Sequence, residues 1–389
     1  MRFLTAGESH GKGLVVIVEG MPAGLPLSED YLAVDLRRRQ GGYGRGRRQK
    51  IEQDRAEIIS GVRHGLTLGS PISLTIQNRD WANWTEQMSI DPIESAVEKV
   101  TRLRPGHADL AGTIKYDFDD VRPILERASA RETAARVAVG GICKRFLEEF
   151  GMSFFSHTVQ IGTVDASIPD EIDWDAVEES PVRCADSASG DRMVAAIDDA
   201  RSAGDTLGGV VEGRVCGVPM GLGSHVHWDR KIDGRLAQAL MSIHSVKGVE
   251  IGGGFALTKL TGSRVHDVIL PREQWTGRPW ARATNNAGGT EGGITDGQDI
   301  VVRIALKPIA TLPRSLPSAD LLTGEEIEAY YERSDVCVVP AAGVIVETMC
   351  AIVLAAAALE KFGGDSMRET LRNWRAFEST TGPRELRES

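Results

Sequence analysis

Residues 338–359 read VVPAAGVIVETMCAIVLAAAAL, an apolar run in which Glu347 is the only charged side chain. A run of this length must be tested as a membrane span. However, Pro340 and Gly343 interrupt its start, and the uninterrupted remainder is too short to cross a bilayer without Glu347. The sequence KFGG at 361–364 is a signal for the C-terminal end of a helix. The run therefore predicts an alanine-rich helix buried inside protein and closely packed against another helix or a subunit.

Patterns along the whole chain predict a mixed fold. Strands are predicted at 13–19, from Ile72 to Ile76, at 210–218 and at 300–306, and helices around 29–39, 92–102, 129–150, 190–203, 229–246 and 342–362. These elements do not alternate as strand, helix, strand, and the sequence holds neither a G-x-G-x-x-G nor a Walker A motif. We predict an α+β fold with largely antiparallel sheets. It forms one domain over residues 1–364, followed by a polar C-terminal tail at 365–389.

Composition excludes several classes of protein. The chain has 389 residues and a net charge of −10, with 41% hydrophobic residues, so global disorder is not expected. The acidic balance argues against a general nucleic-acid or membrane-surface binder. Five scattered cysteines without a C-x-x-C pair, and an N-terminus without a signal peptide, predict a cytoplasmic protein with reduced thiols and no cysteine metal site. Glycine is in excess, with 43 residues against a usual ~7%, and it is clustered.

A basic loop stands out from the acidic remainder. Residues 37–50 read RRRQGGYGRGRRQK, with a charge of +7, which leaves −17 for the rest of the chain. Arginine side chains bind carboxylate and phosphate groups with two parallel hydrogen bonds. The alternatives are a solvated loop and an RNA-binding segment, although no second basic run extends such a track.

Two histidines are flanked by glycine or by a Pro-Gly turn, which leaves the imidazole ring open to a ligand. His10 is part of GESHGKG at 7–13, and His107 follows a Pro-Gly turn in RLRPGHAD at 102–109. A histidine near its ordinary pKa suits proton transfer at neutral pH. For each histidine the alternative is a structural residue in a surface turn, and Asp109 either orients His107 or caps that turn.

Two further segments have the character of ligand sites. Ser129 and Glu132 form a capping box at the start of a long helix, where anions are favoured, and Arg131 lies in that first turn. Residues 285–311 combine a glycine-rich stretch with a strand and with Lys307 and Thr311, which suits backbone wrapped around a flat or charged ligand. The alternative is a glycine-rich surface loop. The residues alone thus indicate a soluble α+β enzyme with an anion site, two exposed histidines and a second ligand.

Taken together, these segments resemble the chorismate synthase family over nearly the whole chain. The resemblance rests on GESHG at 7–11, the loop with Arg39 and Arg45, RPGHAD at 104–109, SARETAARVA at 129–138, KGVEIG at 247–252, GGTEGGITDG at 288–297 and KPIAT at 307–311. It implies a β-α-β sandwich, in which two largely antiparallel sheets enclose central helices, and a homotetramer.

The resemblance also implies a reaction. The family consists of carbon–oxygen lyases acting on phosphates. They convert 5-enolpyruvylshikimate 3-phosphate to chorismate and phosphate by an anti-1,4-elimination, the last common step of the shikimate pathway to aromatic amino acids. The reaction requires reduced FMN without net redox change, and it implies no nucleic-acid, membrane or metal partner. Either NADPH, with Arg39 and Arg45 near it, or a separate flavin reductase would supply the electrons, and no motif decides between them.

The same resemblance assigns roles to individual residues. His10 would give a proton to the departing phosphate, His107 would protonate or hydrogen-bond the reduced flavin, and Asp335 would help to remove the ring proton through flavin N5. The residues implied in substrate binding are Arg39, Arg45, Arg104, Arg131 and Arg333. Those implied in FMN binding are Ser129, Ala130, Arg131, His244, Ser245, Gly292, Lys307, Pro308, Ile309, Ala310, Thr311 and Arg333.

The sequence departs from the family pattern at two places. Many members have Arg-His-Asp where this chain has Arg333-Ser334-Asp335, and many have Asn-Ala where it has His244-Ser245. Serine cannot titrate, but the arginine and the aspartate are kept, so we expect activity to be retained.

Overall fold

The structure is a computed structural model that describes residues 1–46, 53–94, 97–276, 279–332 and 335–386. Its longest helix is α9 (Val339–Phe362), which forms from the apolar run and ends at Gly363 with a φ of 59°. Helix α9 has the length and composition of a membrane span, but 89% of its most apolar window is buried inside the protein. Its closest helical neighbour is α4 (Thr133–Glu148), where a Cβ on Gly140 would lie 2.7 Å from the Cα of Thr348. Small residues therefore allow the close packing that the sequence predicted.

Two antiparallel sheets flank these helices. The four-stranded sheet has the order β1-β2-β6-β3, from β1 (Arg2–Gly7), β2 (Gly13–Glu19), β6 (Ile72–Gln77) and β3 (Glu57–Ser60). The five-stranded sheet has the order β10-β13-β9-β7-β8, from β10 (Val246–Ile251), β13 (Ile300–Leu306), β9 (Gly209–Cys216), β7 (Ser153–Ile161) and β8 (Val164–Asp165). In β2 the alternating side chains of Leu14, Val16 and Val18 are buried, as the period-two pattern predicts.

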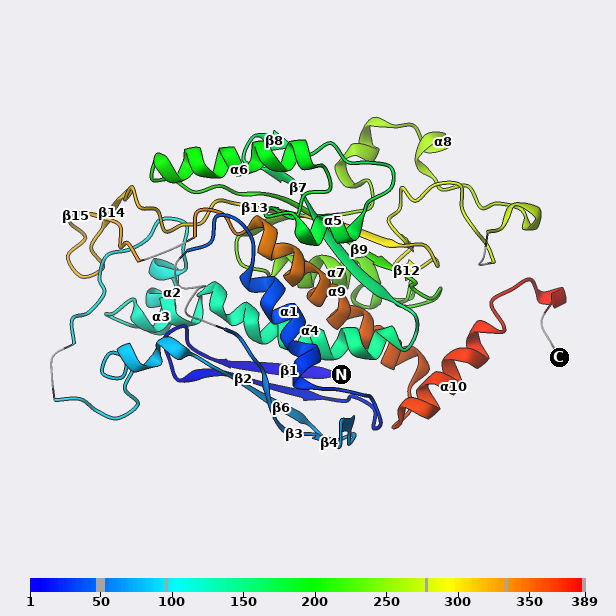
Figure 1. Cartoon of the computed structure of the whole chain (residues 1–389), viewed down its shortest axis with the longest axis horizontal. Helices are drawn as coiled ribbons and strands as arrows, with labels where there is room; N and C mark the ends of the chain where they lie inside the picture. The colour runs from blue at the N-terminus through cyan, green and yellow to red at the C-terminus, as the bar shows by residue number, and fades with distance from the viewer. Residues whose placement is uncertain (47–52, 95–96, 277–278, 333–334, 387–389) are drawn as a thin grey trace.

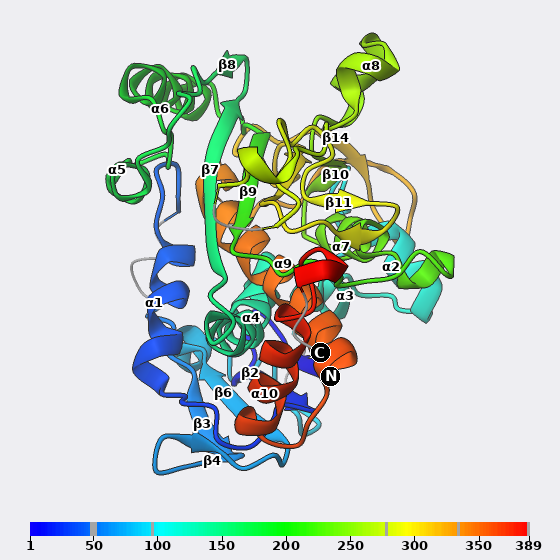
Figure 2. The same cartoon turned by 90° about the vertical axis from the view of Figure 1, so that its right-hand side faces the viewer.

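The helices α1 (Glu29–Gln40), α4 and α9 lie between the two sheets (Figure 1, Figure 2). Helix α4 contacts β2 of the four-stranded sheet, whereas α9 contacts β7 and β9 of the five-stranded sheet. One continuous hydrophobic core includes Leu74 from the first sheet, Ile142 from α4 and Val302 from the second sheet. The α+β class is therefore confirmed.

The remaining elements surround these layers. The other helices are α2 (Asp109–Tyr116), α3 (Arg122–Arg127), α5 (Trp174–Glu179), α6 (Ser187–Ser202), α7 (Ile232–Met241), α8 (Gly262–Val265) and α10 (Met367–Glu378). Short 3-10 helices occupy Arg79–Asn83, Ala130–Glu132, Trp228–Arg230, Gly254–Lys259, Arg272–Gln274 and Arg384–Leu386. Two-stranded ladders form from β4 (Val62–Arg63) with β5 (Leu66–Thr67), β11 (Thr290–Glu291) with β12 (Ile294–Thr295), and β14 (Pro317–Ala319) with β15 (Glu326–Glu328).

Two of the predicted helices need correction. The described part of 92–102 forms no helix, because its backbone pairs with distant segments: the carbonyl oxygens of Val100 and Thr101 accept the N–H groups of Val121 and Leu321, each at 2.8 Å. The helix predicted around 229–246 is shorter, since Ser245 takes a left-handed φ of 67° before β10 begins. The predicted polar tail contains α10, whose Trp374 and Phe377 pack against the core.

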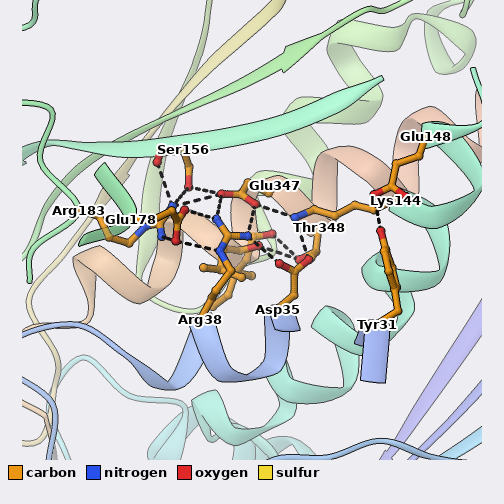
Figure 3. Close-up of polar contacts among 12 residues, drawn as sticks. Tyr31, Asp35, Arg38, Lys144, Glu148, Ser156, Glu178, Arg183, Glu347 and Thr348 are labelled. Atoms are coloured by element: carbon orange, nitrogen blue, oxygen red, sulfur yellow. Dashed lines mark hydrogen bonds and ion pairs between the residues drawn. The ribbon is translucent and has the colours of Figure 1, made fainter. Parts of the chain in front are cut away.

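Glu347, the one charge in the apolar run, lies at the centre of a buried ion-pair network (Figure 3). Its carboxylate accepts hydrogen bonds from Arg38 of α1 at 2.8 Å, from Lys144 of α4 at 2.6 Å and from the hydroxyl of Ser156 of β7 at 2.6 Å. Burial alone would raise the pKa of Glu347, but the charges of Lys144 and Arg38 hold it well below its ordinary value. The network therefore ties α1 and α4 to the central helix.

Candidate functional site

A cavity of about 940 Å³ opens beside the first turns of α4 and α9. Thr133 lines it at the start of α4, and Ala341 and Ala342 line it at the start of α9. The first turn of a helix presents unpaired N–H groups and the positive end of the helix dipole. Both helices therefore make this cavity favourable for anions.

The cavity brings together most of the residues that the sequence suggested. Its lining includes His10, Arg39, Arg45, Arg104, His107, Ser129, Ala130, Arg131, His244, Ser245, Lys307, Ile309, Ala310, Thr311 and Asp335. Pro308 belongs to the same segment as Lys307 and Ile309. Gly292 lies outside this cavity, in the turn between β11 and β12. Arg333 and Ser334 lie outside the described residues.

His10 is buried rather than exposed, with 6% of its surface accessible. Its ring stacks on Trp84, with centroids 3.9 Å apart, and its Nδ1 lies 2.9 Å from Oε1 of Glu126. The sequence predicted an exposed ring because the flanking glycines leave space. The segment that contains Trp84 fills part of that space, and it lies more than 70 positions away along the chain.

His107 has the same kind of partner. Its Nδ1 lies 2.5 Å from Oδ1 of Asp109, whose side chain is fully buried. Burial alone would raise the pKa of Asp109, but hydrogen bonds from His107 and Arg104 lower it to about 2. Asp109 is therefore an ionised acceptor at neutral pH. It lies closer to Nδ1 of His107 than the Arg104 guanidinium does, at 3.0 Å, which favours a proton on Nδ1. Both readings of Asp109 hold, because its Oδ1 contacts the ring and its Oδ2 accepts the backbone N–H of Arg104 at 3.1 Å, which caps the turn.

The cavity arginines are held by carboxylates and by backbone oxygens. Arg39 donates to Thr133 Oγ1 at 2.9 Å and to Asp54 Oδ2 at 3.2 Å, and Asp54 also pairs with Arg131. Burial lowers the pKa of Arg39 to about 10 despite the opposing charge of Asp54, which leaves it cationic at neutral pH. One carboxylate thus fixes two guanidinium groups at the cavity wall.

Arg104 and Lys307 connect two further segments of the wall. Arg104 donates to Asp109 Oδ2 at 2.8 Å and to Thr311 Oγ1 at 3.1 Å. Lys307 donates to the carbonyl oxygen of Gly106 at 2.6 Å, and burial lowers its pKa. The turn before α2 is therefore fixed to the segment that follows β13.

Asp335 faces the basic loop. Its Oδ2 lies 3.0 Å from Nη1 of Arg45, and its Oδ1 accepts from the backbone N–H of Gly46 at 2.5 Å.

Burial lowers the pKa of His244 to about 4, so its imidazole is neutral at physiological pH. The cavity therefore combines cations, a carboxylate and a neutral histidine.

The arginines in the described part of the basic loop do not face one surface. Arg38 points into the core network around Glu347, whereas Arg39 and Arg45 face the cavity. Residues 47–50 lie outside the described part of the chain. The described arginines therefore do not form the open basic track that RNA binding requires.

Sequence reasoning missed the partners of these groups. Asp54, Trp84 and Glu126 had no assigned role, although Glu126 begins the segment that leads into the capping box. Glu126 is 116 positions from His10, and no local pattern joins the two. Among the described residues, no group of three or more His, Cys, Asp or Glu side chains is arranged to hold a metal ion.

Comparisons with known proteins agree with one another along the chain. The sequence model of the family described as chorismate synthase matches residues 1–359. The chorismate synthase of Symbiobacterium thermophilum is 56% identical over 388 residues, 97% of this chain and 98% of that protein. That of Moorella thermoacetica is 57% identical over 383 residues, 97% of this chain and 99% of that protein. A solved structure titled "Crystal Structure of Chorismate Synthase" is 45% identical, with a TM-score of 0.77 over 97% of both chains.

Proposed function

Because the chain belongs to the chorismate synthase family, we propose that its cavity of about 940 Å³ is the active site of that enzyme. The enzyme is a lyase that eliminates phosphate from 5-enolpyruvylshikimate 3-phosphate to give chorismate, at the last common step of the shikimate pathway. The family depends on a reduced flavin. The observation that carries the proposal is that His10, His107 and Asp335, from three distant segments, line one cavity.

The cavity fits a trianionic substrate. A phosphate and two carboxylates need several cations, and Arg39, Arg45, Arg104 and Arg131 line the wall, with Arg333 added by resemblance. Arg45 Nε is buried and has no hydrogen-bond partner among the described residues, so a donor is available for an anion. The first turns of α4 and α9 add to the attraction.

The residues also fit a flavin, which we infer to be FMN. Three groups of residues share the cavity: Ser129, Ala130 and Arg131 from the 3-10 turn before α4; His244 and Ser245; and Lys307, Ile309, Ala310 and Thr311. His244 Nδ1 is buried without a partner among the described residues, which suits a hydrogen bond to a ring heteroatom. Reduced flavin is electron-rich and stabilises charge that develops as the phosphate leaves. Gly292 enters this set by resemblance only.

Three side chains have separate roles in the reaction. His10 in its imidazolium form gives its Nε2 proton to the departing phosphate oxygen, while Glu126 keeps the Nδ1 proton. His107, with Nδ1 held by Asp109, hydrogen-bonds the flavin and maintains its charge. Asp335 helps to remove the proton from the substrate ring. The carbon–hydrogen electrons form a new double bond, the ring double bond already present moves to the adjacent position, and the carbon–oxygen bond to phosphate breaks with its electrons leaving on phosphate, so no net oxidation occurs.

The finer properties follow from the family resemblance. We infer a β-α-β sandwich with one catalytic domain over 1–364 and a C-terminal segment from 365 to 389. This description is supported by helices α4 and α9 between the two sheets. We also infer a homotetramer in the cytoplasm. NADPH and a separate flavin reductase are the two candidate sources of electrons, and oxidation of NADPH by the purified protein with added FMN distinguishes them.

The function is tested by mixing purified protein anaerobically with reduced FMN and 5-enolpyruvylshikimate 3-phosphate. Phosphate release is expected with flavin and not without it. A folded protein that binds FMN and releases no phosphate would refute the proposal. An RNA-binding protein would instead show RNA affinity that falls steeply with salt, and no flavin dependence.

Replacement of Asp335 by asparagine is expected to slow turnover by about 10²-fold, with KM within about threefold of the wild type. Asparagine keeps an oxygen for the Gly46 N–H but loses the ability to take a proton. The measurement is steady-state phosphate release at saturating substrate. Unchanged turnover would remove Asp335 from the chemistry.

A further inference from the structure

The Glu126 carboxylate holds both the backbone and the ring of His10. Its Oε2 accepts the backbone N–H of His10 at 2.7 Å, and its Oε1 lies 2.9 Å from the ring Nδ1. The carbonyl oxygen of Glu126 also accepts the N–H of Ser9 at 3.1 Å. Three hydrogen bonds therefore tie the turn between β1 and β2 to helix α3.

The charge state of Glu126 determines which nitrogen of His10 carries the proton. The Glu126 side chain is fully buried. Burial alone would raise its pKa, but hydrogen bonds and charge from His10, and the charge of Arg122, bring the pKa below its ordinary value. An ionised carboxylate only accepts hydrogen bonds. Nδ1 of His10 is therefore the donor, and Nε2 is the nitrogen that can exchange a proton with a ligand.

Trp84 fixes the plane of the same ring. Its ring stacks on His10 with an interplanar angle of 26°, and its Nε1 donates to Asp80 Oδ2 at 3.1 Å. The guanidinium carbon of Arg122 lies 5.1 Å from the centroid of the Trp84 ring, and Arg122 Nη1 donates to Glu126 Oε1 at 3.2 Å. Glu126 and Trp84 therefore both contact the His10 ring, and Arg122 contacts both of them.

We propose that Glu126 and Trp84 are positioning residues for His10, with Glu126 fixing the tautomer and Trp84 the ring plane so that Nε2 serves the cavity. This inference rests on the proposed function, in which His10 gives a proton to the departing phosphate. Neither residue needs to touch the substrate for this role. A general acid acts only when its protonated nitrogen is held within hydrogen-bond reach of the acceptor, and a small displacement lowers the rate strongly.

The same arrangement has a purely structural alternative. Glu126 also accepts bonds that fix a turn, and its removal would loosen that turn whatever His10 does. The two roles differ in how the Glu126 variant behaves when His10 is absent, because a residue that acts through His10 has nothing left to position.

The kinetic test uses Glu126→Gln, which keeps the size and the acceptor for the backbone N–H. We expect kcat to fall by about 10²-fold with KM within about threefold, as misplacement of a reacting group predicts. The matched control is Glu212→Gln. Glu212 is likewise a buried carboxylate beside a histidine, with its Oε1 3.4 Å from Nε2 of His157. It does not line the cavity, and we expect its replacement to leave kcat within about threefold. Trp84→Phe keeps a stacking ring and should lose less activity than Trp84→Ala.

A double-mutant cycle separates the positioning role from the structural one. In a His10→Ala background, Glu126→Gln should change kcat by less than about threefold. If the Glu126→Gln loss persists in full in that background, Glu126 acts on the fold and the proposal is overturned.

A spectroscopic measurement tests the tautomer without reference to activity. In protein with ¹⁵N-labelled histidine, the His10 signals are assigned by their loss in His10→Ala. The neutral His10 ring of the wild type is expected to be protonated at Nδ1, and Glu126→Gln is expected to shift this tautomer balance. A wild-type ring protonated at Nε2 would overturn the positioning proposal even if the enzyme is active. A wild type that fails to release phosphate but shows the Nδ1 tautomer would overturn the proposed function and leave the positioning intact.

Discussion

Replacing His10 with alanine is expected to lower the rate of phosphate release by about 10²–10⁴-fold, the usual contribution of a general acid. His10 is the histidine that the structure encloses most tightly at the cavity, between Glu126 and Trp84. The alanine variant loses the proton donor, but it keeps the backbone N–H that Glu126 accepts. We therefore expect the variant to fold and to bind substrate, with the loss confined to kcat.

The matched control for His10 is His227→Ala. His227 also pairs with a carboxylate, since its Nδ1 lies 2.8 Å from Asp229, but its side chain is 62% exposed and it does not line the cavity. Its replacement should leave turnover unchanged. An effect of His10→Ala below about threefold would exclude His10 from the proton transfer.

Replacing Glu347 with alanine is expected to lower the free energy of unfolding by about 3–5 kcal/mol, because removal of one partner leaves buried charges uncompensated. Arg38, Lys144 and Arg183 all approach the Glu347 carboxylate, whose side chain is fully buried (Figure 3). Without it, these three cations are left with two carboxylates, Asp35 and Glu178, so one buried positive charge is uncompensated. Urea unfolding followed by circular dichroism measures the change.

A surface ion pair provides the contrast. Glu360 near the end of α9 pairs with Arg230 and Arg235, and its side chain is 43% exposed. Glu360→Ala should cost less than about 1 kcal/mol. Equal losses in the two variants would contradict the claim that the buried network holds the central helix in place.

The Glu347 contribution also has a defined pH dependence. Its pKa in the folded protein is depressed, so its stabilising effect is present above the pKa of an unfolded glutamate, about 4.3. The effect is lost as the pH falls through the lower folded value. The difference in unfolding free energy between wild type and Glu347→Gln should therefore be constant above about pH 5 and shrink in more acidic solution. A difference that grows on acidification would contradict this assignment.

The sequence predicted the fold where a local pattern determines the structure. The apolar run around Glu347 forms α9, and the alternating run at 13–19 forms β2, because period and burial coincide in both. The helix predicted at 92–102 is absent from the described part of that segment. The backbone of Val100 and Thr101 bonds to Val121 and Leu321 instead, and no local pattern reveals these distant partners.

The sequence predicted many of the residues that line the site, but it did not predict which side chains contact one another. Arg38 and Arg39 are neighbours with the same charge, but successive residues of a helix point about 100° apart. One enters the core network and the other faces the cavity. Similarly, Glu126 contacts His10 across 116 positions, so only the tertiary structure brings them together.

The most direct test of the central claim is the stoichiometry of an anaerobic reaction containing the protein, a small amount of reduced FMN and excess 5-enolpyruvylshikimate 3-phosphate. The account predicts equal amounts of phosphate and chorismate, many molecules of each for every flavin, and flavin that is still reduced at the end. Consumption of one flavin for each product, or phosphate release that continues without flavin, would contradict it.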